Sequence, residues 1–223
     1  MSHATHLRVH KSLLAASEKR LLIWIAQRLP PWIHSDHLSA LGLASMAGAG
    51  ASFWLTGSDP VVGAGLVVVC LALNWFGDSL DGTVARVRNQ QRPRYGYYVD
   101  HVIDLAGTAL LFAGLAASGH MTAAVAALVV AAFFLVSAEA YLATHSRGIF
   151  KMAFLGIGPT ELRLVLVAGA FALVFAPVVR PFGVFEIRLF DLGGILGAAG
   201  MVTTFIITSG TNARALYLEE TKR

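Results

Sequence analysis

The chain has 223 residues, of which 56% are hydrophobic and only 13% are charged, and its formal net charge is +4. An average soluble domain carries about 25% charged residues, so the composition excludes an ordinary soluble domain and indicates a protein of the lipid bilayer. The positive charge suits attraction to anionic lipid headgroups, and nucleic acid is not expected as a partner. The single cysteine, Cys70, excludes an intramolecular disulfide and a multi-cysteine metal site.

The N-terminal region mixes Leu, Ile and Trp with Lys and Arg at roughly helical spacing. We expect residues 11–29 to form an amphipathic helix that lies along the membrane interface and ends at Pro30-Pro31. Residues 1–38 lack the short apolar core and small-residue cleavage site of a signal peptide.

Apolar stretches of membrane-spanning length follow along the rest of the chain. They cover residues 39–57, 61–77, 102–119, 121–144, 162–179 and 190–208. The sequence therefore predicts an all-α integral membrane protein with six transmembrane helices in a core over residues 39–208. No repeat or low-complexity linker divides the chain, so we expect a single domain over residues 1–223.

Basic residues predict the orientation, because Lys and Arg collect in short cytoplasmic loops. With six spans and the N-terminus inside, only Arg180 and Arg188 of the seventeen Lys and Arg residues fall outside. Both termini and residues 78–100 are then cytoplasmic. The small-residue run 44–51 would let helices pack closely, and packing within one chain and packing in a homodimer both explain it.

Acidic residues are concentrated between residues 77 and 104. On one predicted helix, positions three or four apart share a face: Asp78, Asp81, Gly82, Ala85 and Arg86. The next helix repeats the pattern at intervals of four with Gly96, Asp100 and Asp104. A basic turn near 87–95 would let the two helices point four carboxylates at one another. Because such carboxylates repel and are costly at membrane depth, we expect a divalent cation among them.

Carboxylate oxygens suit Mg²⁺ or Mn²⁺, as one or two ions, rather than zinc. Mg²⁺ usually keeps positions open for water or phosphate oxygens, which indicates a phosphorylated substrate. Gly82 and Ala85 have almost no side chain on the carboxylate face, so a flat or bulky group can approach the backbone there. Arg86 adds a planar cation suited to a diphosphate.

The order and spacing of these residues resemble the motif of the CDP-alcohol phosphotransferases, also called CDP-alcohol phosphatidyltransferases. Eight positions match in type and order: Asp78, Asp81, Gly82, Ala85, Arg86, Gly96, Asp100 and Asp104. The spacer 87–95 has nine residues, where the family usually has eight. The motif also follows the second predicted span, as in the family.

The resemblance implies a phospholipid-synthesising transferase that moves a substituted phosphate from a CDP-linked donor to an alcohol, with release of CMP. One of the two substrates is normally a membrane lipid. Asp78, Asp81, Asp100 and Asp104 would bind metal, and Asp104 would also be the base for the acceptor hydroxyl. By the same resemblance Arg86 would hold the diphosphate, and the cytidine pocket would be lined by Gly82, Ala85 and Gly96.

Two segments outside the motif resemble the family more weakly. Asp36 and Ser39 replace the Asn and Thr of a family segment that lines the nucleotide pocket, but they would equally cap the first span. Arg147 and Lys151, on the turn between the fourth and fifth spans, would bind a phosphorylated acceptor or simply lie at the interface.

The donor branch stays open between CDP-diacylglycerol, for phosphatidyl transfer, and a CDP-choline or CDP-ethanolamine type, for transfer to a lipid alcohol. His101 and the pair Thr160-Glu161 are similar to the choline and ethanolamine phosphotransferase branch. A basic acceptor pocket would favour the other branch.

Two other classes compete with this interpretation. A membrane prenyltransferase also binds a diphosphate through Mg²⁺, but it would have two separate Asp-rich motifs. A divalent-cation channel or transporter would have acids at several depths, and only Glu139 fits that pattern, unless it hydrogen-bonds another helix. Arg88, Arg92 and Arg94 are interpreted as topology signals or lipid-headgroup contacts.

Overall fold

The computed structural model describes residues 7–8, 15–150 and 159–221. Within these residues the chain forms seven α-helices: α1 Ala15–Ala26, α2 Ser35–Leu55, α3 Pro60–Val87, α4 Pro93–Ala117, α5 Ala123–Arg147, α6 Pro159–Phe175 and α7 Leu189–Thr221. The predicted all-α class is confirmed.

Five of these helices are long and apolar enough to cross a membrane: α2, α3, α4, α5 and α7, with 21 to 33 residues each. The sixth predicted span corresponds to α6, which has 17 residues. Since spanning helices have about 17 to 25 residues, α6 is at the short limit. The chain is a multi-pass membrane protein, and the count of six spans stays a prediction.

The helices around the acidic motif extend further than the apolar spans. We expected the second span to end at residue 77, but α3 continues to Val87. The predicted turn at 87–95 is therefore shorter, because α4 already begins at Pro93. Charged residues do not end a helix, whereas proline is favoured at the first helical position. The last span likewise continues beyond residue 208 to Thr221.

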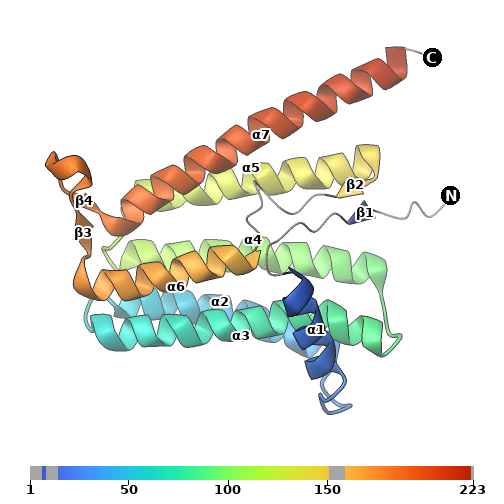
Figure 1. The fold of residues 1–223 in the computed structure, drawn as a ribbon, viewed down its shortest axis with the longest axis horizontal. Helices are drawn as coiled ribbons and strands as arrows, with labels where there is room; N and C mark the ends of the chain where they lie inside the picture. The colour runs from blue at the N-terminus through green and yellow to red at the C-terminus, as the bar shows by residue number, and fades with distance from the viewer. Residues whose placement is uncertain (1–6, 9–14, 151–158, 222–223) are drawn as a thin grey trace.

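Figure 1 shows the long helices running side by side along the molecule, with α7 inclined to the others and α1 crossing one end of the bundle. Helix α1 packs on α2 and α3 through a buried cluster: Leu22, Ala26, Leu38, Leu80 and Val84. Its crosswise direction is the one that an interfacial helix would have. Residues 11–14 of the predicted helix lie outside the described residues.

A larger apolar core joins the membrane helices. Its members include Phe53 of α2, Leu71 of α3, Leu111 and Leu115 of α4, and Leu173 of α6. Phe53 meets Phe190 of α7 edge to face, with ring centroids 5.4 Å apart. In a bilayer such packing holds helices together through van der Waals contact.

Helices α2 and α4 approach so closely that a side chain would not fit between them. A Cβ atom on Gly114 would lie 1.9 Å from the carbonyl oxygen of Gly50, and one on Gly50 would lie 2.4 Å from the carbonyl oxygen of Leu110. The run 44–51 is thus used for packing within the chain. A homodimer stays a prediction.

Short strands in the connections were not predicted from the sequence. β1, Leu7–Arg8, pairs in parallel with β2, Ile149–Phe150. β3, Val178–Val179, pairs in antiparallel fashion with β4, Ile187–Arg188, and a 3₁₀ turn, Pro181–Gly183, lies between them. Strands of two residues are too short to show the alternation of apolar and polar residues from which strands are predicted.

Candidate active site

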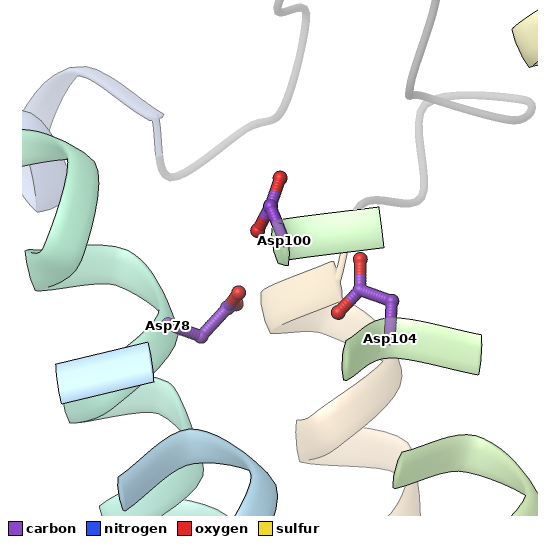
Figure 2. A group of neighbouring side chains, drawn as sticks. All are labelled: Asp78, Asp100 and Asp104. Carbon is purple, nitrogen blue, oxygen red and sulfur yellow. The ribbon is translucent and has the colours of Figure 1, made fainter. Parts of the chain in front are cut away.

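Three of the four predicted carboxylates come together between α3 and α4. Each of Asp78, Asp100 and Asp104 offers an oxygen, and these oxygens all lie within 4.8 Å of one another. Figure 2 shows the three side chains facing a common space. The cause is local, because Asp100 and Asp104 are four residues apart on α4 and therefore share one helical face.

The three carboxylates fit a hard divalent cation. Mg²⁺ holds its oxygens at about 2.1 Å, so two opposite ligands are about 4.2 Å apart. The spacing of at most 4.8 Å therefore needs only small side-chain rotations. Oxygen-only ligands favour Mg²⁺ or Mn²⁺ over zinc. All three side chains are partly exposed, which leaves access for a phosphate.

Asp81 takes a different position in this structure. Its Oδ2 accepts a 2.6 Å hydrogen bond from the Ser39 hydroxyl of α2, and its Oδ1 accepts a hydrogen bond from the Gly82 amide. It is not in the group of three carboxylates. Metal binding by Asp81 stays a prediction.

Arg163 of α6 is a site residue whose contact the sequence did not reveal. Its Nη2 donates to Asp78 at 2.5 Å, and its Nε donates to Asn74 at 2.7 Å. Asn74 is buried and donates in turn to the carbonyl oxygen of Gly42, at 3.0 Å. A charged residue one turn inside an apolar helix needs a partner. This was the signal in the sequence that indicated a contact for Arg163.

The residues predicted to bind the donor follow Asp78 along α3 and precede Asp100 on α4. The guanidinium of Arg86 lies over Gly82, since a Cβ added to Gly82 would meet Arg86 Nη1 at 3.2 Å. Arg86 Nη2 also donates to the Thr83 hydroxyl at 3.0 Å. A Cβ on Gly96, by contrast, would meet nothing within 4 Å among the described residues.

A pocket of about 420 Å³ opens beside Ala85. It lies between the start of α2, the end of α3 and the turn before α4, and its lining is His34, Ser35, Asp36, Val84, Ala85, Gln90, Gln91 and Arg92. Asp36 and Arg92 form a close ion pair in this lining. Gly82, Ala85 and Gly96 were expected to line a cytidine pocket. Of these three, Ala85 is in the lining of this pocket.

Arg147, one of the two predicted acceptor residues, contacts helix α7 in this structure. Arg147 of α5 donates to Asn212 of α7 at 2.6 Å and lies 3.8 Å from Glu219. Lys151 lies outside the described residues. Asn212 also donates to Glu139, at 2.5 Å. Glu139 therefore hydrogen-bonds another helix, which is one of the two alternatives that we expected for it. An acceptor role for Arg147 and Lys151 stays a prediction.

Other candidates from the sequence have structural partners. His101 is buried, with Nδ1 3.4 Å from an oxygen of Asp100, and its ring centroid is 4.1 Å from that of Tyr97. The Thr160 hydroxyl donates to Glu18 of α1 at 2.9 Å, and the Trp75 indole donates to the same carboxylate at 2.7 Å. Glu18 thereby ties α1 to α3 and α6.

Arg88 organises the connection between α1 and α2. Its guanidinium donates to four backbone carbonyls, at 2.6 to 3.4 Å. They belong to Leu29, Pro30, Pro31 and Ile33. Arg88 is therefore a structural residue, beyond the topology signal or headgroup contact that we expected.

These features define a class: a helical membrane protein with a cluster of carboxylates suited to a divalent cation and a polar pocket nearby. The model of the CDP-alcohol phosphatidyltransferase family matches residues 37–206. The chain therefore belongs to the CDP-alcohol phosphatidyltransferase family, and it is a membrane transferase of phospholipid synthesis.

Solved structures show the same fold. The phosphatidylinositol phosphate synthase of Mycobacterium tuberculosis with CDP-DAG bound is similar, with a TM-score of 0.63 and 20% identity over 86% of this chain and 94% of that one. Its apo form has a TM-score of 0.57 and 20% identity, over 86% of this chain and 93% of that one. Comparison with curated proteins gives no match.

Proposed function

We propose that the protein transfers a phosphatidyl group from CDP-diacylglycerol to an alcohol at the cytoplasmic membrane surface and releases CMP. The observation that supports this most is the convergence of Asp78, Asp100 and Asp104 next to a pocket lined by Ala85 of the same motif. Family membership sets aside the prenyltransferase and channel alternatives.

Two observations favour CDP-diacylglycerol as the donor. The similar synthase of Mycobacterium tuberculosis has CDP-DAG bound. Two of the residues that suggested the choline and ethanolamine branch have structural partners, since His101 is buried beside Tyr97 and Thr160 donates a hydrogen bond to Glu18. The acceptor is an alcohol, and a phosphorylated one would use the positive charge of Arg147 and Lys151.

In the proposed reaction Asp104 accepts the proton of the acceptor hydroxyl. The alcohol oxygen then attacks the phosphorus that carries the diacylglycerol, a new P–O bond forms, and the bond to the CMP oxygen breaks. Asp78, Asp81 and Asp100, together with Asp104, would hold Mg²⁺ or Mn²⁺, which neutralises charge on the diphosphate. Arg86 would hold the diphosphate from the side of Gly82.

The test is a donor panel with the purified full-length protein. CDP-diacylglycerol, CDP-choline and CDP-ethanolamine are each incubated with Mg²⁺ and a set of alcohols: glycerol phosphate, inositol phosphate, inositol, serine and diacylglycerol. CMP release and the lipid product are both measured. We expect turnover with CDP-diacylglycerol and one water-soluble alcohol, and its loss in EDTA.

Turnover with CDP-choline or CDP-ethanolamine and diacylglycerol would assign the other branch. No CMP release above hydrolysis with any pair of substrates would contradict the proposed function.

A further inference from the structure

Glu18, in the first turn of α1, contacts both α3 and α6 with one carboxylate oxygen. Its Oε1 accepts a hydrogen bond from the Trp75 indole of α3 at 2.7 Å and another from the Thr160 hydroxyl of α6 at 2.9 Å. A carboxylate oxygen that accepts two hydrogen bonds fixes the directions of both donors. Three helices that are far apart in the sequence therefore meet at this one side chain.

The position of Glu18 is fixed, because the same face of α1 packs on the helix bundle. Leu22 and Ala26 follow Glu18 at intervals of four residues and therefore lie on its side of the helix. Both are buried, and they form a cluster with Leu80 and Val84 of α3. Helix α1 is thus anchored to α3 and can act as a fixed support for α6.

The first turns of α6 direct much of their apolar surface outward. Leu162, Leu164 and Val165 are 51%, 53% and 63% exposed, so these side chains do not hold the helix against α3. Between helices in lipid, polar side chains that hydrogen-bond across the interface contribute to association. The hydrogen bond from Thr160 to Glu18 therefore helps to place this end of α6.

This contact lies next to the carboxylate site. Thr160 and Arg163 are three residues apart on α6. Trp75 and Asp78 are likewise three residues apart on α3. Each pair shares one helical face and is separated by about 4.5 Å along its helix. Because Arg163 contacts Asp78 from the same face that carries Thr160, loss of the contact with Glu18 moves Arg163 relative to Asp78.

We infer that Glu18 is a positioning residue for the carboxylate site, where it holds Arg163 against Asp78. This role rests on the proposed function only in that Asp78, Asp100 and Asp104 are the site of a divalent cation. When Arg163 is displaced, Asp78 loses its counter-charge, and an added cation supplies the missing charge. Helix α1 is then part of the framework of the active site.

The rise in unfolding temperature from EDTA to saturating Mg²⁺, measured on the purified full-length protein in detergent, tests this role. Glu18→Ala removes the acceptor, so Asp78 is less compensated, and we expect the rise to be about twofold larger than in the wild type. Thr160→Val removes the donating hydroxyl, keeps the shape of the side chain and should show the same increase. Lys19→Ala is the matched control, because it removes an exposed charged side chain of the same helix and should respond to Mg²⁺ as the wild type does.

A second comparison separates positioning from a merely structural contact. If Glu18 acts through Arg163, Glu18→Ala adds no further increase to the Mg²⁺ response of Arg163→Gln, because residues of one network do not act additively. Glu18→Gln keeps an oxygen that accepts both hydrogen bonds, so it should restore the wild-type response. A contact that only stabilises the fold would lower the unfolding temperature equally in EDTA and in Mg²⁺.

Three results would overturn the inference. The first is a wild-type Mg²⁺ response in Glu18→Ala and in Thr160→Val, with Thr160→Val alone deciding if Glu18→Ala does not fold. The second is a further increase when Glu18→Ala is combined with Arg163→Gln. The third is a response of Glu18→Gln as large as that of Glu18→Ala.

These results are distinguishable from failure of the proposed function, because the Mg²⁺ response requires no turnover. If Glu18→Ala shows the larger response but no donor releases CMP, the reaction is wrong and the role of Glu18 stands. If the wild type turns over CDP-diacylglycerol while Glu18→Ala and Thr160→Val respond to Mg²⁺ as the wild type does, the role of Glu18 is wrong and the reaction stands.

Discussion

At the scale of single residues, the site depends on charges that are arranged around one small space. Asp78, Asp100 and Asp104 repel one another, and Arg163 offsets part of that repulsion through its contact with Asp78. The side chains of Arg163 and Asp78 are 14% and 24% exposed, so water screens their interaction only in part. Each of these charges therefore has a measurable effect on stability or turnover.

Asp104→Asn should reduce CMP release at least 100-fold, because the amide cannot accept the proton of the alcohol. The measurement is CMP release by the purified variant, together with its thermal unfolding. Asp59→Asn is the matched control, since the Asp59 side chain caps α3 by accepting from the Val62 amide and asparagine caps equally well. Wild-type turnover in a folded Asp104→Asn protein would disprove the base assignment.

Arg163→Gln should destabilise the metal-free protein by about 3 kcal/mol, because it leaves the half-buried Asp78 carboxylate uncompensated. Added Mg²⁺ should then stabilise the variant more than the wild type, since the ion replaces the missing positive charge. Thermal unfolding in EDTA and at increasing Mg²⁺ concentration measures both effects.

Arg180→Gln serves as the control for that experiment, because it removes an ion pair with Glu186 whose side chains are 70% and 60% exposed. Its unfolding should respond to Mg²⁺ as the wild type does. Equal Mg²⁺ responses in Arg163→Gln and the wild type would show that Arg163 does not compensate the carboxylates.

At the scale of helices, the position of α4 decides whether its acids reach α3. Helix α4 is held against α2 at the contact of Gly50 and Gly114, where backbone meets backbone. Helix α2 in turn packs along α3, with Gly77 close to the Leu38 carbonyl oxygen and to the amide of Gly42. Small residues at these crossings thus set the separation of the two helices that present the carboxylates.

Gly114→Ala should separate α2 from α4 and destabilise the protein by about 1 to 3 kcal/mol, as overpacking does. We also expect weaker Mg²⁺ stabilisation, because α4 presents Asp100 and Asp104. Gly65→Ala is the control: a Cβ there meets nothing within 4 Å among the described residues, and alanine favours the helix. Similar unfolding midpoints for the two variants would argue against the close contact.

At the scale of the whole molecule, the number of membrane-spanning helices determines on which side of the membrane each connection lies. Gln90 lies in the turn before α4, and Val184, which is 78% exposed, lies after α6. The helices α4, α5 and α6 separate these two positions. Three crossings put them on opposite sides of the membrane, and two crossings put them on the same side.

Single cysteines at these positions test the six-span prediction. In a Cys70→Ser background, we expect Gln90→Cys to react with an impermeant thiol reagent only from the cytoplasmic side and Val184→Cys only from the outside. Labelling of sealed vesicles of both orientations measures this. Reaction of both cysteines from the same side would mean that the short helix α6 does not cross.

The sequence by itself determined the features that depend on neighbouring residues along one helix. The apolar stretches indicated the membrane helices, and the spacing of Asp100 and Asp104 placed both on one face, because helical periodicity is a local property. The motif from Asp78 to Asp104 also indicated the family to which the chain belongs.

Only the tertiary structure decided which side chains meet across helices. Arg163 reaches Asp78 over 85 positions of the chain, Ser39 reaches Asp81 over 42, and Arg92 reaches Asp36 over 56. Such pairs depend on the rotation and separation of packed helices, which follow from close contacts such as that of Gly50 with Gly114. Periodicity within one helix contains no information about the face of another helix that it meets.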